Sequence, residues 1–168
     1  MRALFTLAFI VGLAAQPAQA VQTCPSGNPR IAPDSRYTVH GDGTVTDLRT
    51  GLMWKQCSEG QSGASCTGTV STMTWASALS AAENTVFAGF SDWRLPSAKE
   101  LQSLVETGCF GPAINEARFP NTSTGYYWSS SSVAAYASGA WVVVFDYGGV
   151  YVSGRSGNYG VRLVRGGQ

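Results

Sequence analysis

Residues 92–101 constrain the fold of this chain more than any other stretch. They combine a short apolar run, a proline that interrupts it and a helix start. Ser97 is predicted to accept a hydrogen bond from the backbone N–H of Glu100, while the Glu100 carboxylate accepts one from the Ser97 N–H, which makes a capping box. We therefore expect a strand over residues 92–95 and a helix over residues 97–107.

A second helix and several strands are predicted around this stretch. Apolar residues recur at helical spacing from Trp75 to Val86, with Thr74 as the N-cap. Alternating or β-branched runs, separated by glycine-containing turns, predict strands at residues 36–40, 44–47, 52–54, 126–129, 140–147, 150–153 and 161–165. Because the helices are segregated between two groups of strands, the pattern indicates an α+β fold with antiparallel sheets and two helices.

The first twenty residues have the features of a secretory signal peptide. Arg2 precedes the apolar run 3–15, and Ala18 and Ala20 form a small-x-small cleavage site before Val21. We expect a signal peptide over residues 1–20, an irregular lead-in over 21–35 and one domain over 36–168. The expected product is an exported protein of bacterial type, in the periplasm, on the cell surface or in the medium, with no membrane insertion after cleavage.

The charge balance bears on the class of partner. Ten of the 11 basic residues remain after removal of Arg2, and they face 10 acidic ones. This balance argues against a nucleic-acid partner, which requires clustered Lys and Arg. Arg155, Arg162 and Arg165 lie close together in the sequence, and they are interpreted as scattered surface charge or a small basic patch.

Four cysteines lie beyond the signal peptide, and in an oxidising compartment an even count indicates disulfides. Cys57 and Cys66 flank a polar loop and are natural partners, so Cys24 and Cys109 pair by elimination. A zinc site is the alternative, but no two cysteines have C-x₂-C spacing and His40 is the only histidine. The expected domain is therefore stapled by two disulfides.

Several short motifs resemble the Lcl C-terminal domain family, long regarded as a domain of unknown function. They are the runs at residues 50–54, 92–96, 100–101, 127–130 and 160–165. The resemblance implies a C-type lectin-like fold and a binding role. The family's namesake domain belongs to a collagen-like adhesin that binds sulfated glycosaminoglycans, but this chain has no collagen repeat.

Neither the calcium chemistry nor the oxidase chemistry of C-type lectin-like proteins is expected here. Sugar-binding C-type lectins hold Ca²⁺ with a Glu-Pro-Asn or Gln-Pro-Asp motif, and the chain has neither. Formylglycine-generating relatives use cysteines near the C-terminus, and none follows Cys109. No cofactor is therefore expected, although Asp42 in a Gly-Asp-Gly turn leaves a structural calcium site as an alternative.

The sequence offers little for catalysis. The serine run 129–132 lacks a nucleophile-elbow motif, and His40 is the only imidazole base. The region from Tyr126 to Tyr159 combines tyrosines with Ser, Gly and Asn, a composition typical of recognition surfaces. The candidate ligand-binding residues are Asp146, Tyr147, Tyr151, Arg155, Asn158 and Tyr159. Residues 153–160 are the best candidate binding loop.

The expected function is that of a secreted, non-catalytic and adhesin-like binding module that recognises a glycan or a surface protein through its C-terminal loops. The alternative is a structural or assembly domain of an envelope or appendage complex without a small ligand. An enzyme derived from the same fold is the third hypothesis.

Overall fold

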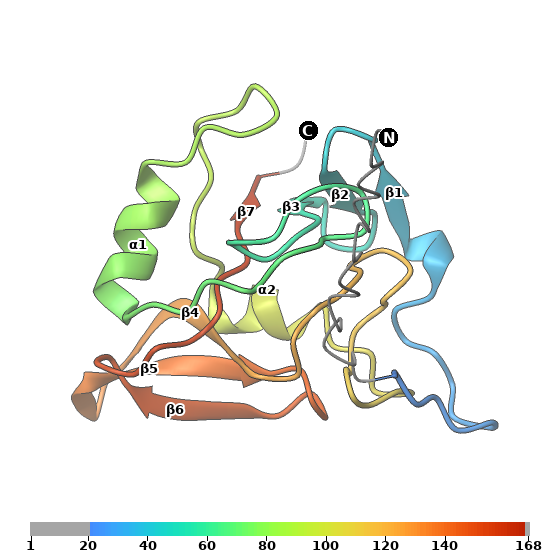
Figure 1. Ribbon diagram of the computed structural model, residues 1–168. Coiled ribbons are helices and arrows are strands. Elements are labelled where there is room, and N and C mark those ends of the chain that lie inside the picture. The colour runs from blue at the N-terminus through green and yellow to red at the C-terminus, as the bar shows by residue number, and fades with distance from the viewer. Residues whose placement is uncertain (1–20, 167–168) are drawn as a thin grey trace, which may run out of the picture.

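The computed structural model describes residues 21–166 and contains two antiparallel sheets, two α-helices and one 3-10 turn. The predicted signal peptide lies outside the described residues. In chain order the elements are η1 (Asp34–Arg36), β1 (Tyr37–Val39), β2 (Thr44–Asp47), β3 (Leu52–Lys55), α1 (Trp75–Glu83), α2 (Ala98–Gln102), β4 (Tyr126–Val133), β5 (Tyr136–Val144), β6 (Val150–Gly154) and β7 (Val164–Arg165). Figure 1 shows the three-stranded sheet at the bottom, α1 at the upper left and the four-stranded sheet from the upper centre to the upper right, with α2 just above the three-stranded sheet.

The four-stranded sheet has the order β1-β2-β3-β7, so the last strand of the chain pairs with the N-terminal meander. Asp47, at the end of β2, is fully buried and accepts hydrogen bonds from Arg36 Nε, the Arg49 N–H and the Thr50 hydroxyl. Burial by itself raises the pKa of the Asp47 carboxyl, but the Arg36 and Thr50 hydrogen bonds outweigh it and hold the pKa below its usual value.

The three-stranded sheet has the order β4-β5-β6. Gly148 adopts a φ of 82° in the turn between β5 and β6, a conformation that glycine adopts readily. The outer edge of β4 is covered by backbone hydrogen bonds, from the Trp128 N–H to Gly160 and from the Ser130 N–H to Pro96. Within residues 21–166, no strand pairs with the outer edge of β6.

The capping box is present, and both of its hydrogen bonds form at the start of α2. Arg94 donates two further hydrogen bonds to Glu100, and these bonds lower the pKa of that carboxyl to about 2. The predicted extents were partly wrong. Residues 92–95 do not form the predicted strand. Arg94 instead makes an isolated bridge to Val164, and this single backbone pairing docks the segment on β7.

Both helices are shorter than predicted. The helix α2 ends at Gln102, since the Leu104 and Val105 N–H groups bond three residues back instead of four. Their side chains are nevertheless buried, as expected. The helix α1 ends at Glu83 and Val86 is 75% exposed, because Asn84 caps the helix C-terminus.

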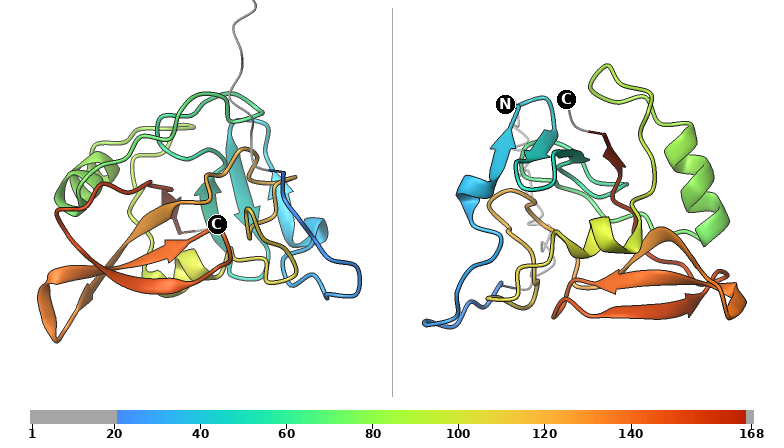
Figure 2. Two further views of the ribbon diagram at one scale, coloured as in Figure 1. Left: turned by 60° about the horizontal axis from the view of Figure 1, so that its bottom comes forward. Right: turned by 180° about the vertical axis from the view of Figure 1, so that it is seen from behind.

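The apolar side chains form two clusters, one on each face of the three-stranded sheet. One contains Trp54 with Leu101, Leu104 and Phe145, together with Ile114 and Phe119 of the 111–125 connection. The other lies under α1 and contains Trp93, Trp128, Val142, Val161 and Leu163. Figure 2 shows from behind that α1 stands at one end of the three-stranded sheet and the four-stranded sheet at the other.

The segment leading into the last strand differs from its prediction. Residues 161–165 were expected to alternate between core and solvent, but all five are buried and only Val164–Arg165 is a strand. The segment passes between the two clusters, so both of its faces meet protein. Arg162 and Arg165 are consequently buried, and the interpretation of the C-terminal arginines as surface charge was wrong.

Two disulfides staple the fold, Cys24–Cys109 and Cys57–Cys66. The first ties the irregular lead-in to the segment after α2. Glu106 reinforces this attachment, because its buried carboxylate accepts hydrogen bonds from the N–H groups of Ile31, Ala32 and Gly108. No helix within residues 21–166 has the length and apolar character that a membrane crossing requires.

Candidate functional site

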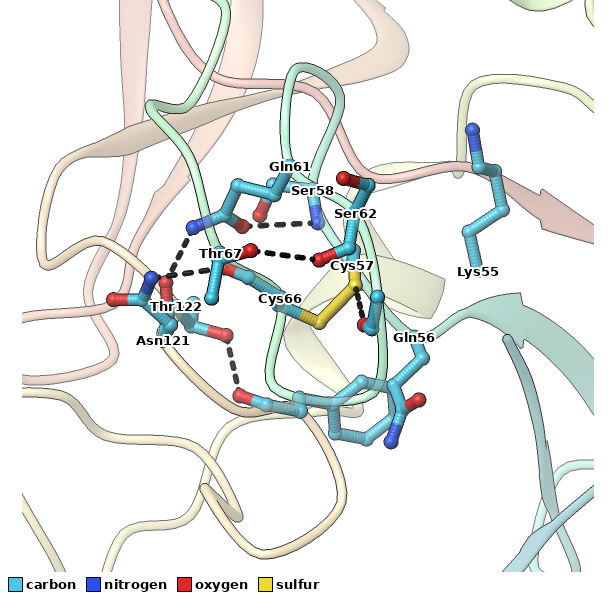
Figure 3. The surroundings of a disulfide bond; sticks show 12 residues. Lys55, Gln56, Cys57, Ser58, Gln61, Ser62, Cys66, Thr67, Asn121 and Thr122 are labelled. Carbon is cyan, nitrogen blue, oxygen red and sulfur yellow. Dashed lines mark hydrogen bonds between the residues drawn. A yellow bond between two sulfur atoms is a disulfide. The ribbon is translucent and has the colours of Figure 1, made fainter. Parts of the chain in front are cut away.

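The Cys57–Cys66 loop forms one wall of a surface groove. Cys66 is fully buried, and Ser62 and Thr67 exchange two backbone hydrogen bonds of 2.9 Å across the base of the loop. The closed loop, which was predicted as a polar segment between the cysteines, therefore has a defined conformation. Figure 3 shows the disulfide with the polar side chains around it.

Two amide side chains join this loop to the 111–125 connection. Gln61 Nε2 donates to the Asn121 carbonyl over 2.8 Å, and Asn121 Nδ2 donates to the Cys66 carbonyl over 2.9 Å (Figure 3). Gln61 Oε1 also accepts from the Ser58 N–H. These bonds hold two segments that are 60 residues apart in the sequence at a constant spacing.

The groove between these segments has a volume of about 520 Å³. This lies within the range of roughly 300–1,000 Å³ typical of small-ligand sites. The loop contributes Gln61, and the segment that follows it contributes Thr69 and Thr72. The connection contributes Asn121 and Ser123, and the C-terminal region contributes Tyr126, Tyr127, Asn158 and Tyr159. No residue that lines the groove carries a charged side chain.

A row of tyrosine rings leads from this groove along the β4-β5-β6 sheet. The ring centroids of Tyr159 and Tyr126 are 5.3 Å apart, and Tyr151 follows at 6.4 Å from Tyr126. Tyr147 lies 6.4 Å beyond Tyr151 and donates its hydroxyl to the Tyr151 hydroxyl over 3.0 Å. This hydrogen bond raises the pKa of Tyr147 to about 12.

The three outer rings of the row are open to solvent. Tyr126, Tyr151 and Tyr147 are 40%, 44% and 56% exposed. Tyr159, in contrast, is half-buried against Trp128, and its hydroxyl bonds to Ser153. The row therefore has a fixed inner end and an exposed outer end, which suits a surface that presents flat aromatic area to a ligand.

Two glycines lie beneath these rings. A Cβ at Gly149 would lie 2.6 Å from the Tyr151 ring and 2.8 Å from the Tyr147 ring, and one at Gly157 would lie 2.9 Å from the Tyr159 ring. A side chain at either position would require the neighbouring tyrosine rings to shift. The mixture of glycine and tyrosine that suggested a recognition surface thus has a packing reason.

The sequence-predicted candidates lie in four different settings. Tyr147 and Tyr151 belong to the tyrosine row, and Asn158 and Tyr159 line the groove. Asp146 is exposed and does not line the groove. Arg155 has a structural role, because its guanidinium lies 4.0 Å from the Trp75 ring centroid and donates to the Gly139 carbonyl.

Residues 153–160 are consequently not a free loop. The Met73 and Tyr159 backbones exchange two hydrogen bonds, and the Trp75 N–H donates to the Arg155 carbonyl. These hydrogen bonds anchor the segment to the start of α1. They fix the floor of the groove and leave Asn158 exposed. Within this predicted binding loop, Asn158 and Tyr159 line the groove, while the backbone is held in place by Met73 and Trp75.

The sequence analysis missed the groove wall formed by Gln61, Thr69, Thr72, Asn121 and Ser123. Nothing local distinguishes these residues from ordinary loop polar groups. The disulfide was the only available signal, since it indicates that residues 57–66 are held together. Their partnership with residues 121–123 depends on long-range hydrogen bonds that no spacing reveals.

Arg162 lies behind the groove with a side chain that is fully buried. Its Nη1 donates to the Lys55 and Gln56 carbonyls, and its Nη2 donates to the Ser58 and Thr122 hydroxyls. Within residues 21–166 it forms no ion pair. Burial therefore lowers its pKa, and its four oxygen partners all remain neutral.

The alternative calcium position at Asp42 is engaged in a turn. The Asp42 carboxylate accepts from both the N–H and the hydroxyl of Thr44, at 2.9 and 2.6 Å. These hydrogen bonds lower its pKa, chiefly through the Thr44 hydroxyl. No group of three or more His, Cys, Asp or Glu residues suited to a metal ion occurs in the described part of the chain.

We expect the double substitution Cys57→Ala, Cys66→Ala to lower the free energy of unfolding by about 2–3 kcal/mol, the chain-entropy value for a loop this short. The fold should persist, because the two hydrophobic clusters do not depend on this loop. Urea denaturation and circular dichroism test both statements. Ser65→Ala, in the same loop, is the control, and complete unfolding of the double variant would contradict the prediction.

Together these features define a small disulfide-linked α+β domain that carries an uncharged groove beside exposed aromatic rings. The chain belongs to the Lcl C-terminal domain family, whose sequence model matches residues 43–165. That match includes the Cys57–Cys66 loop and the whole tyrosine row. No curated protein matches the chain.

Proposed function

We propose that this protein is an exported, non-catalytic binding module that holds a glycan in the groove and along the tyrosine row. The two disulfides support export, since such bonds persist in oxidising compartments. A C-type lectin-like fold is part of this proposal, consistent with the antiparallel sheets and two helices. One observation carries it, namely that exposed tyrosine rings adjoin a groove lined by amides and hydroxyls.

The chemistry of these groups matches that of a sugar. Aromatic faces pack against the C–H groups of a pyranose ring, while amides and hydroxyls both donate to and accept from its hydroxyls. The two kinds of group occur together where Tyr126 and Tyr159 enter the groove. Binding should need no calcium, so EDTA should leave it unchanged.

A glycan array read with and without EDTA tests the proposal. Tyr126→Ala should weaken capture of the best glycan at least tenfold, about 1.4 kcal/mol, because it removes the ring shared by groove and row. Tyr136→Ala makes the same change at a ring of similar exposure outside the groove and should leave affinity unchanged. Equal losses from both substitutions, or no bound glycan, would contradict the proposal.

The unpaired outer edge of β6 favours a second candidate, an assembly domain. This edge carries no proline and no lysine, and Tyr151 and Val152 are exposed along it. Such edges accept an additional strand from a partner chain. Light scattering distinguishes the two functions, since a monomer at all concentrations weakens the assembly role. The Val152→Pro variant should then abolish any dimer that does form.

A further inference from the structure

We infer that the groove recognises neutral glycans and discriminates against sulfated or carboxylated ones. This inference rests on the proposed function and narrows its ligand class. It starts from the groove lining, in which every polar side chain is an amide or a hydroxyl. No lysine, arginine or histidine is available there to contact an anion.

The energetics of anion transfer lead to this discrimination. A sulfate or carboxylate that leaves water loses strong hydration and must regain it through charge-assisted hydrogen bonds. Neutral amides and hydroxyls return only part of this loss. A sugar hydroxyl loses far less on transfer and finds partners in the same groups, so the lining selects against charge on the ligand.

Three side chains at the groove remain free to bind such hydroxyls. Within residues 21–166, the side chains of Thr69, Thr72 and Asn158 make no hydrogen bond, and all three residues are exposed. Each offers both a donor and an acceptor. They come from two different segments, so together they can contact a ligand from two sides.

The buried Arg162 guanidinium is the strongest opposing influence, because a positive charge behind the groove attracts anions. It cannot contact them, since its side chain is completely buried. Its Nη groups are already engaged with four protein oxygens, and Ser58 and Tyr127 intervene between it and the groove. What remains is a long-range field without a donor that reaches the ligand, so we expect the uncharged lining to prevail.

The test uses matched glycans that share one backbone and differ only in sulfate or uronate groups. We expect the neutral member to bind at least tenfold more tightly than its sulfated counterpart. Its dissociation constant should change less than twofold between about 50 and 500 mM NaCl, because no ion pair is available for salt to screen. The Thr72→Arg variant supplies the missing cation and should acquire salt-sensitive binding of the sulfated member.

The outcomes separate the two proposals. Tighter, salt-sensitive binding of the sulfated member by the unaltered protein would overturn the neutral-ligand inference and leave glycan binding intact. Capture of neither member of any pair would overturn both.

The Asn158→Ala variant removes one of the free groove side chains. It should weaken binding of the neutral glycan at least threefold while leaving the urea midpoint of unfolding unchanged. The control is Asn28→Ala, which changes another exposed asparagine that is distant from Asn158 in the sequence.

Discussion

Replacing Arg162 with methionine should lower the free energy of unfolding by about 2–4 kcal/mol, since each buried acceptor left without a donor costs about 1–3 kcal/mol. Removal of the charge also removes the desolvation penalty of the buried guanidinium, and this effect by itself would stabilise the fold. The loss prevails because four oxygens lose the Arg162 donor, and these oxygens join two segments of the fold, residues 55–58 and Thr122. Urea denaturation measures the difference.

Arg162→Lys separates charge from geometry. Lysine keeps the positive charge, but its single nitrogen cannot reach the Lys55 and Gln56 carbonyls and the Ser58 and Thr122 hydroxyls together. We expect it to be destabilised nearly as much as the methionine variant. Full recovery of stability would show that charge, and not the planar fork, is what this position requires. Arg49→Met makes the same change at an exposed arginine and should stay within about 0.5 kcal/mol of the unaltered protein.

Asp47→Asn should be the most damaging change in the four-stranded sheet, at about 3–5 kcal/mol, the usual result of breaking a buried ion pair. The Arg36 and Asp47 side chains are 5% and 0% exposed, and Arg36 Nε lies 2.7 Å from Asp47 Oδ1. The asparagine is nearly the same size, so packing is kept while the Arg36 charge is left without its counter-ion. Asp42→Asn, in an exposed turn, is the control and should have little effect.

The Asp47→Asn substitution should also change how the stability of the protein depends on pH. The folded-state pKa of Asp47 is lowered, so its stabilising contribution is present above the unfolded pKa of about 3.9 and is lost as pH falls through the folded value. The unaltered protein should therefore lose stability steadily below about pH 5, with Glu106 contributing in the same direction. The asparagine side chain of the variant does not titrate, so its loss of stability should be smaller. Parallel curves for the two proteins would contradict this assignment.

Much of the architecture could be predicted because its signals are local. The Ser97–Glu100 capping box depends on residues three apart, and it forms as expected. The same holds for the N-cap at Thr74, the turn at Gly148 and the class of fold. The pairing of Cys57 with Cys66 followed from their short separation, which left Cys24 and Cys109 as the remaining pair.

The groove could not be predicted in this way, because its walls meet only in three dimensions. The Gln61 side chain donates to the Asn121 carbonyl across 60 residues, and the Asn121 side chain donates to the Cys66 carbonyl. Arg162 was misjudged for the same reason, since an arginine in an alternating run indicates an exposed strand face. Its burial depends on carbonyls and hydroxyls that converge from other segments. Short-range patterns thus specified caps, turns and class of fold, whereas hydrogen bonds between distant segments determined which polar residues line the groove and which are enclosed.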